Sequence, residues 1–365
     1  MAPGFPANDV LKAVKVGPSV GWGNLQCTRE SVEDSGVRPS PRPANGAIPA
    51  GAPKTPDPRT IRFALITLVA GAVAIGASPI FVRLSEVGPS ATAFWRIALA
   101  LPVLWVWAEV GNRRPRSASR PSRYVDILIL ALAGLFFTGD IALWHWSVVL
   151  TSVANATLLV NLAPIFVALG SWLLFGERFT AAFIAGMVVA LAGSILLVGR
   201  DLALDAQDIS GDALALLAAV FYAGYILTVS RLRSRFSTAT IMVSSGAVTC
   251  VALLPITLLS GGDLLAATAF GWAVLLGVAL ISHAGGQSLI TYALSYLPAA
   301  FSSVGLLLQP VAAAVLAWAI LNEALDTWQA MGGAVVLAGV FLTHRGVYRR
   351  PHKELPTPEA EKRPE

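Results

Sequence analysis

Long apolar runs alternate with short polar breaks along most of the chain. A helix needs about 20 apolar residues to cross roughly 30 Å of hydrocarbon, and a segment in lipid must satisfy its own backbone hydrogen bonds. The runs lack the period-two alternation of a membrane β-barrel. The pattern therefore predicts an all-α integral membrane protein with ten transmembrane helices, at about 63–82, 91–109, 125–148, 152–175, 181–199, 211–230, 238–259, 269–294, 299–321 and 328–344.

Composition supports a bilayer environment. The chain is 55% hydrophobic and 13% charged, with mean hydropathy +0.68, whereas soluble domains carry about 25% charged residues. The net charge of +5 lies in short arginine clusters between apolar runs, so we expect lipid and no nucleic acid as a partner. Neither cysteine has metal-ligand spacing or a plausible disulfide partner, and we expect no metal and no cofactor.

The two ends of the chain differ from this pattern. Residues 1–60 are rich in proline and charge, which predicts a disordered cytoplasmic tail, and residues 346–365 read the same way. The N-terminal tail lacks the apolar core of a signal peptide; an upstream choice of start codon is an alternative origin. The expected organisation is a five-helix unit at 61–199, an acidic connecting loop at 200–210 and a second five-helix unit at 211–345.

Arginines in the breaks predict orientation. With ten spans, nearly all of them fall on one side of the membrane, and acidic residues dominate the other side. Because positive charge marks the cytoplasmic face, both termini should be cytoplasmic in a bacterial-type inner membrane. The one-sided groups are Arg59 and Arg62, then Arg113, Arg114, Arg116, Arg120 and Arg123, then Arg178, then Arg231, Arg233 and Arg235, then Arg345, Arg349 and Arg350.

An internal repeat relates the two units. The stretch TSVANATLLVNLAPIFVALGSWLLFGERFT, from Thr151, aligns with LPAAFSSVGLLLQPVAAAVLAWAILNEALD, from Leu297, at an offset of 146 residues. Each repeat has five spans, an odd number, so the second enters the membrane from the opposite side. Inverted repeats of this kind are common in secondary transporters. The offset matches Pro164 with Pro310, Trp172 with Trp318, Glu177 with Glu323, Gly186 with Gly332 and Gly193 with Gly339.

These two stretches, together with ATAFWRIALALP around Arg96, resemble the EamA family of the drug/metabolite transporter superfamily over about residues 61–345. The resemblance implies a ten-helix fold with cytoplasmic termini. It also implies a central cavity lined by the first, third, fourth, sixth, eighth and ninth helices, with the fifth and tenth peripheral. Family members move metabolites, amino acids or drugs, often outward.

Ionisable groups at membrane depth are expensive and therefore suggest function. Asp140 lies in the third span, where it could bind a proton or a substrate ammonium, or could pair with a helix terminus, a hydroxyl or an arginine. Trp144, four residues on, shares its face. His145 lies about 140° around the helix at 100° per residue, so we expect it away from that wall, near the outer boundary.

The eighth span carries His283 and Gln287 on one face. At the 146-residue offset His283 matches Phe137, one turn from Asp140. This motivates the hypothesis that Asp140 and His283 form a titrating pair around a shared cavity; the alternative is that His283 bonds a backbone carbonyl.

Further polar and structural candidates follow. Asn161 and Gln309 could orient a substrate or join helices, and Tyr222, Tyr225 and Ser78 complete the candidate lining. Pro164 and Pro310 permit paired kinks. We expect structural roles for Arg96, either at the outer headgroups or paired with Glu86, and for Glu177 and Glu323. Small residues along the fifth and tenth spans favour internal packing, with a homodimer face as the alternative.

The predicted function is a secondary transporter, and more narrowly an exporter, of a small metabolite, amino-acid-like or drug-like solute, with proton coupling as a further expectation. The sequence has no nucleotide-binding P-loop, so we expect no ATP-driven transport by this chain alone. It has no H-E-x-x-H motif, and its one G-x-S-x-G match, residues 17–21, lies in the proline-rich N-terminal tail, so we expect no enzyme. The alternatives are a membrane scaffold or receptor and, less favoured, an intramembrane enzyme.

Overall fold

The computed structural model describes residues 57–112, 124–151, 153–198, 209–321 and 326–348, and every regular element in these ranges is a helix. Ten helical segments there are long and apolar enough to cross a membrane, as predicted. The first repeat contains α2 (Pro58–Gly76), α3 (Ser78–Leu84), α4 (Pro89–Ala98), α5 (Ala100–Asn112), α6 (Tyr124–Leu150), α7 (Val153–Val160), α8 (Ala163–Phe175) and α9 (Ala181–Val198).

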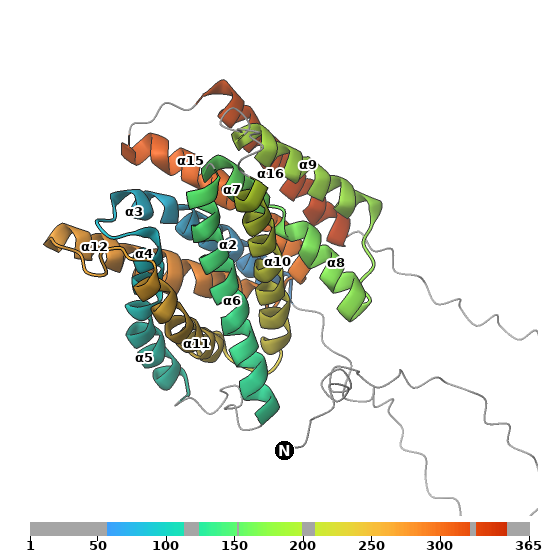
Figure 1. The fold of residues 1–365 in the computed structure, drawn as a ribbon. Coiled ribbons are helices and arrows are strands. Elements are labelled where there is room, and N and C mark those ends of the chain that lie inside the picture. The colour runs from blue at the N-terminus through green and yellow to red at the C-terminus, as the bar shows by residue number, and fades with distance from the viewer. Residues whose placement is uncertain (1–56, 113–123, 152, 199–208, 322–325, 349–365) are drawn as a thin grey trace, which may run out of the picture. The chain divides into compact units, whose positions relative to one another are not determined.

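The second repeat follows the same order (Figure 1). It contains α10 (Ile209–Leu232), α11 (Thr238–Leu259), α12 (Ala269–Gly277), the π-helical η2 (Val278–Gln287), α13 (Ser288–Ala293), α14 (Ala299–Gly305), α15 (Leu308–Leu321) and α16 (Thr327–Tyr348). Most of both predicted tails, most of the 200–210 loop, the arginine cluster at 113–123 and Glu323 lie outside the described residues. The inner ends of the tails were predicted wrongly as disordered, because α2 begins at Pro58 and α16 continues to Tyr348.

Large apolar side chains cover the outside of the bundle. Val251 is 75% exposed, Phe341 57% and Trp172 55%. A soluble monomer seldom leaves such an extensive apolar surface in water, so these side chains face lipid. The chain is a multi-pass membrane protein.

Several spans are interrupted rather than continuous. The fourth breaks at Asn161, between α7 and α8, and the ninth breaks at the matching position Leu307, between α14 and α15. Pro164 and Pro310 lie in the first turns of α8 and α15, where proline loses no helical hydrogen bond. Breaks at Ala77 and Leu99 and the π-helical turns of η2 were not predicted. Interrupted helices free backbone groups that can face a cavity.

The contact between α9 and α16 shows that the repeats are inverted. The two helices lie side by side (Figure 1). A Cβ on Gly186 would lie closer than 3.0 Å to Thr343, and a Cβ on Gly332 equally close to Leu197. The two contacts are equivalent in the two repeats, because Gly332 is the counterpart of Gly186 and Thr343 is the counterpart of Leu197 at the offset of 146 residues. As numbers rise along α9 they fall along α16, so these equivalent helices are antiparallel.

The same symmetry recurs further inside. Phe137 on α6 and its counterpart His283 on η2 stack on each other, with ring centroids 5.6 Å apart and planes 24° apart. Equivalent residues can touch only where they lie beside the pseudo-two-fold axis. That axis therefore passes between Phe137 and His283, and places the third and eighth spans at the centre of the protein.

Two loops cross between the repeats. The loop after α3 supplies Glu86, whose carboxylate accepts hydrogen bonds from the backbone N–H groups of Ala267 (3.0 Å) and Thr268 (3.0 Å) and from the Thr268 hydroxyl, at the start of α12. These donors hold the pKa of Glu86 below its ordinary value. In the equivalent loop after α10, Arg235 forms an ion pair of 2.8 Å with Asp126 at the start of α6.

Candidate functional site

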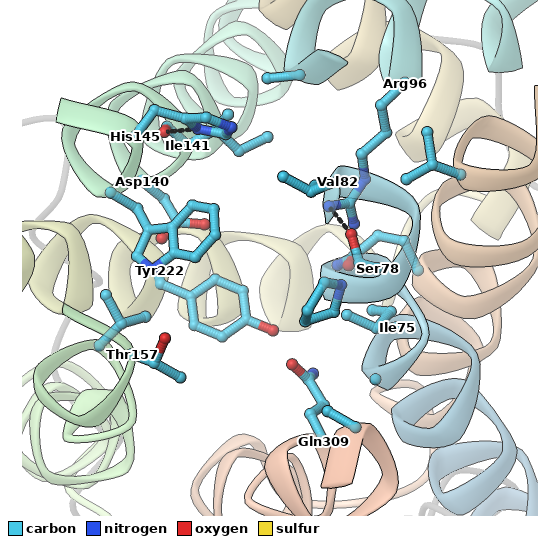
Figure 2. A pocket seen from close by; sticks show the side chains of 18 of the residues that line it. Ile75, Ser78, Val82, Arg96, Asp140, Ile141, His145, Thr157, Tyr222 and Gln309 are labelled. Carbon is cyan, nitrogen blue, oxygen red and sulfur yellow. Dashed lines mark hydrogen bonds between the residues drawn. The ribbon is translucent and has the colours of Figure 1, made fainter. Parts of the chain in front are cut away.

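A cavity of about 210 Å³ lies among α2, α3, α4, α6, α7, α10, η2 and α15. Figure 2 shows polar side chains from several of these helices pointing into it. All six spans that the resemblance implies, the first, third, fourth, sixth, eighth and ninth, contribute to the wall. In addition, α4 of the second span contributes Thr92, Ala93 and Arg96. In the described part of the chain, α5, α9, α11 and α16 take no part in it.

Asp140 projects into this cavity from α6 (Figure 2). Its helix packs closely against α10, because Gly139 and Gly224 leave room for the rings of Phe221 and Phe136. Among the described residues, no side chain or backbone group forms a hydrogen bond or an ion pair with the Asp140 carboxylate. Its charge interacts at longer range with Arg96. A carboxylate without a hydrogen-bond partner at membrane depth is costly, which marks it as a group that awaits a ligand or a proton.

Arg96 also lines the cavity, which corrects its predicted location. Its Nη1 donates a hydrogen bond to Ser78 Oγ (3.2 Å), and its Nε is buried without a partner. The expected pairing with Glu86 is wrong, because Glu86 binds the start of α12 instead. Arg96 lies two turns inside α4 and points inward across the break at Ala77, so it does not extend to the headgroups (Figure 2).

Trp144 and His145 both line the cavity, although His145 was expected elsewhere. The prediction was wrong because the cavity touches an arc of about 140° of α6, wide enough to include side chains five residues apart. His145 Nδ1 is 2.6 Å from the backbone oxygen of Ile141, and its Nε2 is buried without a partner. The two rings meet edge to face, with centroids 5.0 Å apart.

Neutral polar groups form the far side of the cavity. The Tyr222 hydroxyl points toward the Gln309 carboxamide (Figure 2). Asn161 lies at the break between α7 and α8, and its Nδ2 is buried without a partner, as is Gln309 Nε2. Both residues line the cavity, and their unused donors are buried beside its wall.

Tyr225 and His283 do not belong to the wall. Both are 1% exposed, and Phe137 lies between them and the cavity, stacked on His283 and 4.8 Å from the Tyr225 ring. Gln287 does line the cavity, and its Nε2 donates to the Tyr225 hydroxyl (3.3 Å). Both nitrogens of His283 are buried without a partner, so the alternative, a bond to a backbone carbonyl, is absent from the described residues. The Asp140–His283 pair remains a hypothesis without a direct contact.

Comparison with known proteins agrees with this architecture. The model of the EamA-like transporter family matches residues 62–199 and 209–345. The chain belongs to the EamA-like transporter family. Each matched segment is one of the two repeats, and the protein is a membrane transporter.

Named relatives of this EamA-like transporter include exporters. It is 31% identical to a probable terminal-alkyne amino-acid exporter of Streptantibioticus cattleyicolor, over 80% of this chain and 96% of that protein. It is 28% identical to an uncharacterized transporter of Archaeoglobus fulgidus, over 72% and 91%. It is 30% identical to the threonine/homoserine exporter of Salmonella typhimurium, over 61% and 73%. A solved crystal structure shares the fold, with TM-score 0.62 at 17% identity, covering 76% of this chain and 95% of that one.

Sequence reasoning missed part of the wall of this transporter. Thr157 lies on α7 one turn before Asn161, and Val82 and Val160 supply apolar surface. Hydroxyl and aliphatic residues are common in membrane helices, so they carry no distinctive signal. Arg96 did carry one, because an arginine inside an apolar run is costly, but its short distance from the span's end favoured a structural interpretation.

Proposed function

We propose that this transporter exports a small polar metabolite through the central cavity, and that Asp140 binds it. The observation that carries the proposal is the Asp140 carboxylate, which lies in a cavity between two inverted repeats and has no hydrogen bond or salt bridge among the described residues. The remaining candidates on the wall, Trp144, Asn161, Tyr222, Gln287 and Gln309, would orient the solute through their polar atoms and aromatic faces.

The size of the cavity favours a metabolite over a drug. Its 210 Å³ is below the roughly 300–1,000 Å³ typical of sites for drug-sized ligands. Two of the relatives are named as a probable terminal-alkyne amino-acid exporter and a threonine/homoserine exporter. These names support export of a small amino-acid-like solute by this chain.

Movement would follow from the pseudo-symmetry. Two halves of opposite orientation can exchange conformations and so open a central site to either side in turn. The paired breaks at Asn161 and Leu307 supply equivalent bending points in the two repeats. The orientation we propose puts both termini in the cytoplasm of a bacterial-type inner membrane, because the arginines at the ends of the spans then face inward.

Proton exchange is the coupling that the site favours. A carboxylate that can hold either a proton or a cationic group of the solute, but not both, links release of one to binding of the other. Protons entering from outside would then displace solute toward the outside. The described part of the chain offers no second unpaired carboxylate on the cavity wall to separate the two functions.

An efflux experiment tests the proposal. Purified full-length protein in liposomes would be loaded with a panel of amino acids, polyamines and organic acids, and efflux followed by mass spectrometry with and without an inward proton gradient. We expect at least one solute to leave faster than from loaded liposomes that lack the protein, and faster still with the gradient. With Asp140→Asn, we expect the rate of the protein-free liposomes. Asp263→Asn, in an exposed loop, is the matched control and should transport normally. Efflux that Asp140→Asn leaves unchanged would contradict the proposal.

A further inference from the structure

Arg96 and Asp140 place opposite charges on one cavity and interact electrostatically without forming a salt bridge among the described residues. Arg96 comes from α4 and Asp140 from α6, and Figure 2 shows their side chains on opposite sides of the open space. No ion pair joins them among the described residues. Opposite charges at membrane depth attract each other strongly, so two helices that hold them apart leave room for something between them.

The Arg96 guanidinium has spare donors. It carries five N–H groups, of which one binds Ser78, while the buried Nε has no partner. A buried arginine is costly unless its donors are satisfied, and its planar fork matches a carboxylate in bidentate geometry. Ser78 holds the fork at the break between α2 and α3, so the guanidinium is positioned by the protein before an anion arrives.

Asp140 provides the complementary requirement. A carboxylate only accepts hydrogen bonds when ionised, and this one has no donor among the described residues. An ammonium group supplies three donors and one positive charge. The nearby face of Trp144, one turn along α6, suits a cation as well, because an aromatic face attracts positive charge.

We propose that the solute is a zwitterion whose carboxylate binds Arg96 and whose ammonium binds Asp140. This inference rests on the proposed function and narrows it to amino acids and their close analogues. Val82, Val160 and Pro310 line the same cavity and give the solute's side chain an apolar surface. A cavity with one positive and one negative wall group discriminates against both plain amines and plain acids, because each would leave one charged residue unpaired.

Blocked analogues separate the two contacts. The purified full-length protein would be titrated with each of the twenty standard L-amino acids, with the methyl ester of each, which lacks the carboxylate, and with the N-acetyl derivative of each, which lacks the ammonium. Affinity would be read from the ligand-dependent shift in Tm. We expect at least one amino acid to bind, and both of its blocked forms to bind about 10–100-fold more weakly, the usual range for loss of one charge-assisted hydrogen bond.

Variants assign each contact to its residue. Arg96→Gln should bind the amino acid and its methyl ester equally, and Asp140→Asn should bind the amino acid and its N-acetyl form equally. These are ratios within one variant, so the folded fraction does not affect them. Arg96→Lys, which keeps the charge without the fork, should retain part of the preference against the ester. Arg83→Gln and Asp263→Asn, both exposed, should keep both preferences.

The outcomes distinguish this inference from the function on which it rests. Equal binding of an amino acid and its ester in the unmodified protein would overturn the inference, as would unchanged preferences in both cavity variants or binding of no amino acid. If the efflux panel then shows Asp140-dependent transport of an amine or an acid, the proposed zwitterion site is wrong and the proposed export function is supported. If no solute leaves the liposomes, the exporter itself is wrong.

Discussion

The two repeats share one architecture but contribute differently to the cavity. The first supplies both charged groups, Asp140 and Arg96. At the offset of 146 residues Asp140 corresponds to Gly286, where a Cβ would lie only 2.9 Å from Ile75. Asn161 likewise corresponds to the buried Leu307. Symmetry is kept in the packing, and the residues that could bind a solute have diverged.

The connecting loops teach the same lesson. In each repeat, the loop between the first two spans binds the start of the third span of the other repeat. One link is a carboxylate accepting from backbone N–H groups at α12, and the other is an arginine–aspartate ion pair at α6. The position of the link is common to both halves, while its chemistry has changed.

The largest expected contrast is between Asn161 and its counterpart Leu307. Leu307 is 1% exposed, and Leu307→Ala should lower the free energy of unfolding by about 2–5 kcal/mol because it leaves a cavity in the packing. Asn161→Leu should leave stability nearly unchanged and slow efflux by about 2–10-fold, the effect of one lost hydrogen bond. Thermal unfolding and efflux, measured on both variants, check this. If Asn161→Leu lowers the free energy of unfolding as much as Leu307→Ala does and leaves efflux unchanged, the assignment of roles is wrong.

The second prediction concerns the equivalence of the packing. Gly193→Ala and Gly339→Ala should each destabilise by about 1–3 kcal/mol, because either Cβ would meet backbone atoms of the partner helix. The two losses should be similar, since the sites are related by the pseudo-two-fold axis. Gly333→Ala is the control, because its Cβ would reach only Val311, at 3.4 Å. A large loss at one site alone would argue against inverted symmetry at this interface.

The third prediction concerns the stacked pair on the axis. His283→Phe should raise the free energy of unfolding by about 1 kcal/mol, because it removes buried ring nitrogens that have no partner and keeps the stack on Phe137. Thermal unfolding measures the gain, and Phe137→His should show the opposite sign. If His283→Phe instead abolishes the response of efflux to a proton gradient, the Asp140–His283 hypothesis would be supported.

The smallest effect is expected at the Glu86 link. Because hydrogen bonds lower the pKa of Glu86 in the folded protein, its ionised form contributes stability above its ordinary pKa of 4.5, and this contribution is lost as the pH falls through the lowered value. Glu86→Gln should therefore lower Tm slightly at pH 7, with the difference from the unmodified protein disappearing as acidification protonates Glu86 in the folded protein. A difference that grows on acidification would have the wrong sign.

Much of the fold could be predicted from the sequence because lipid imposes simple rules. Span length, one-sided arginines and the repeat offset each depend on local sequence or on one alignment, and the ten spans and their inversion are confirmed. The breaks at Ala77 and Leu99 and the turns of η2 depend on tertiary packing and were not predicted.

The candidate site was predicted less completely. Asp140, Trp144, Asn161, Tyr222, Gln287 and Gln309 lie on the cavity wall as expected, because membrane cavities collect the few polar side chains of apolar helices. Arg96, His145, Tyr225 and His283 lie elsewhere than predicted. Their positions depend on how wide an arc of each helix faces the cavity and on the Phe137 ring, which separates His283 from the cavity. Neither can be derived from helical spacing.

The central claim is that Asp140 lies in a cavity that opens to each side of the membrane in turn. The direct measurement is labelling of Asp140→Cys, with Cys27 and Cys250 both replaced by serine, by a membrane-impermeant methanethiosulfonate added to either side of reconstituted vesicles. Ala190→Cys, buried against α16, is the unlabelled control, and Asp263→Cys, in an exposed loop, should react from one side only. We predict that Asp140→Cys reacts from both sides. Reaction from one side alone would contradict alternating access through this cavity.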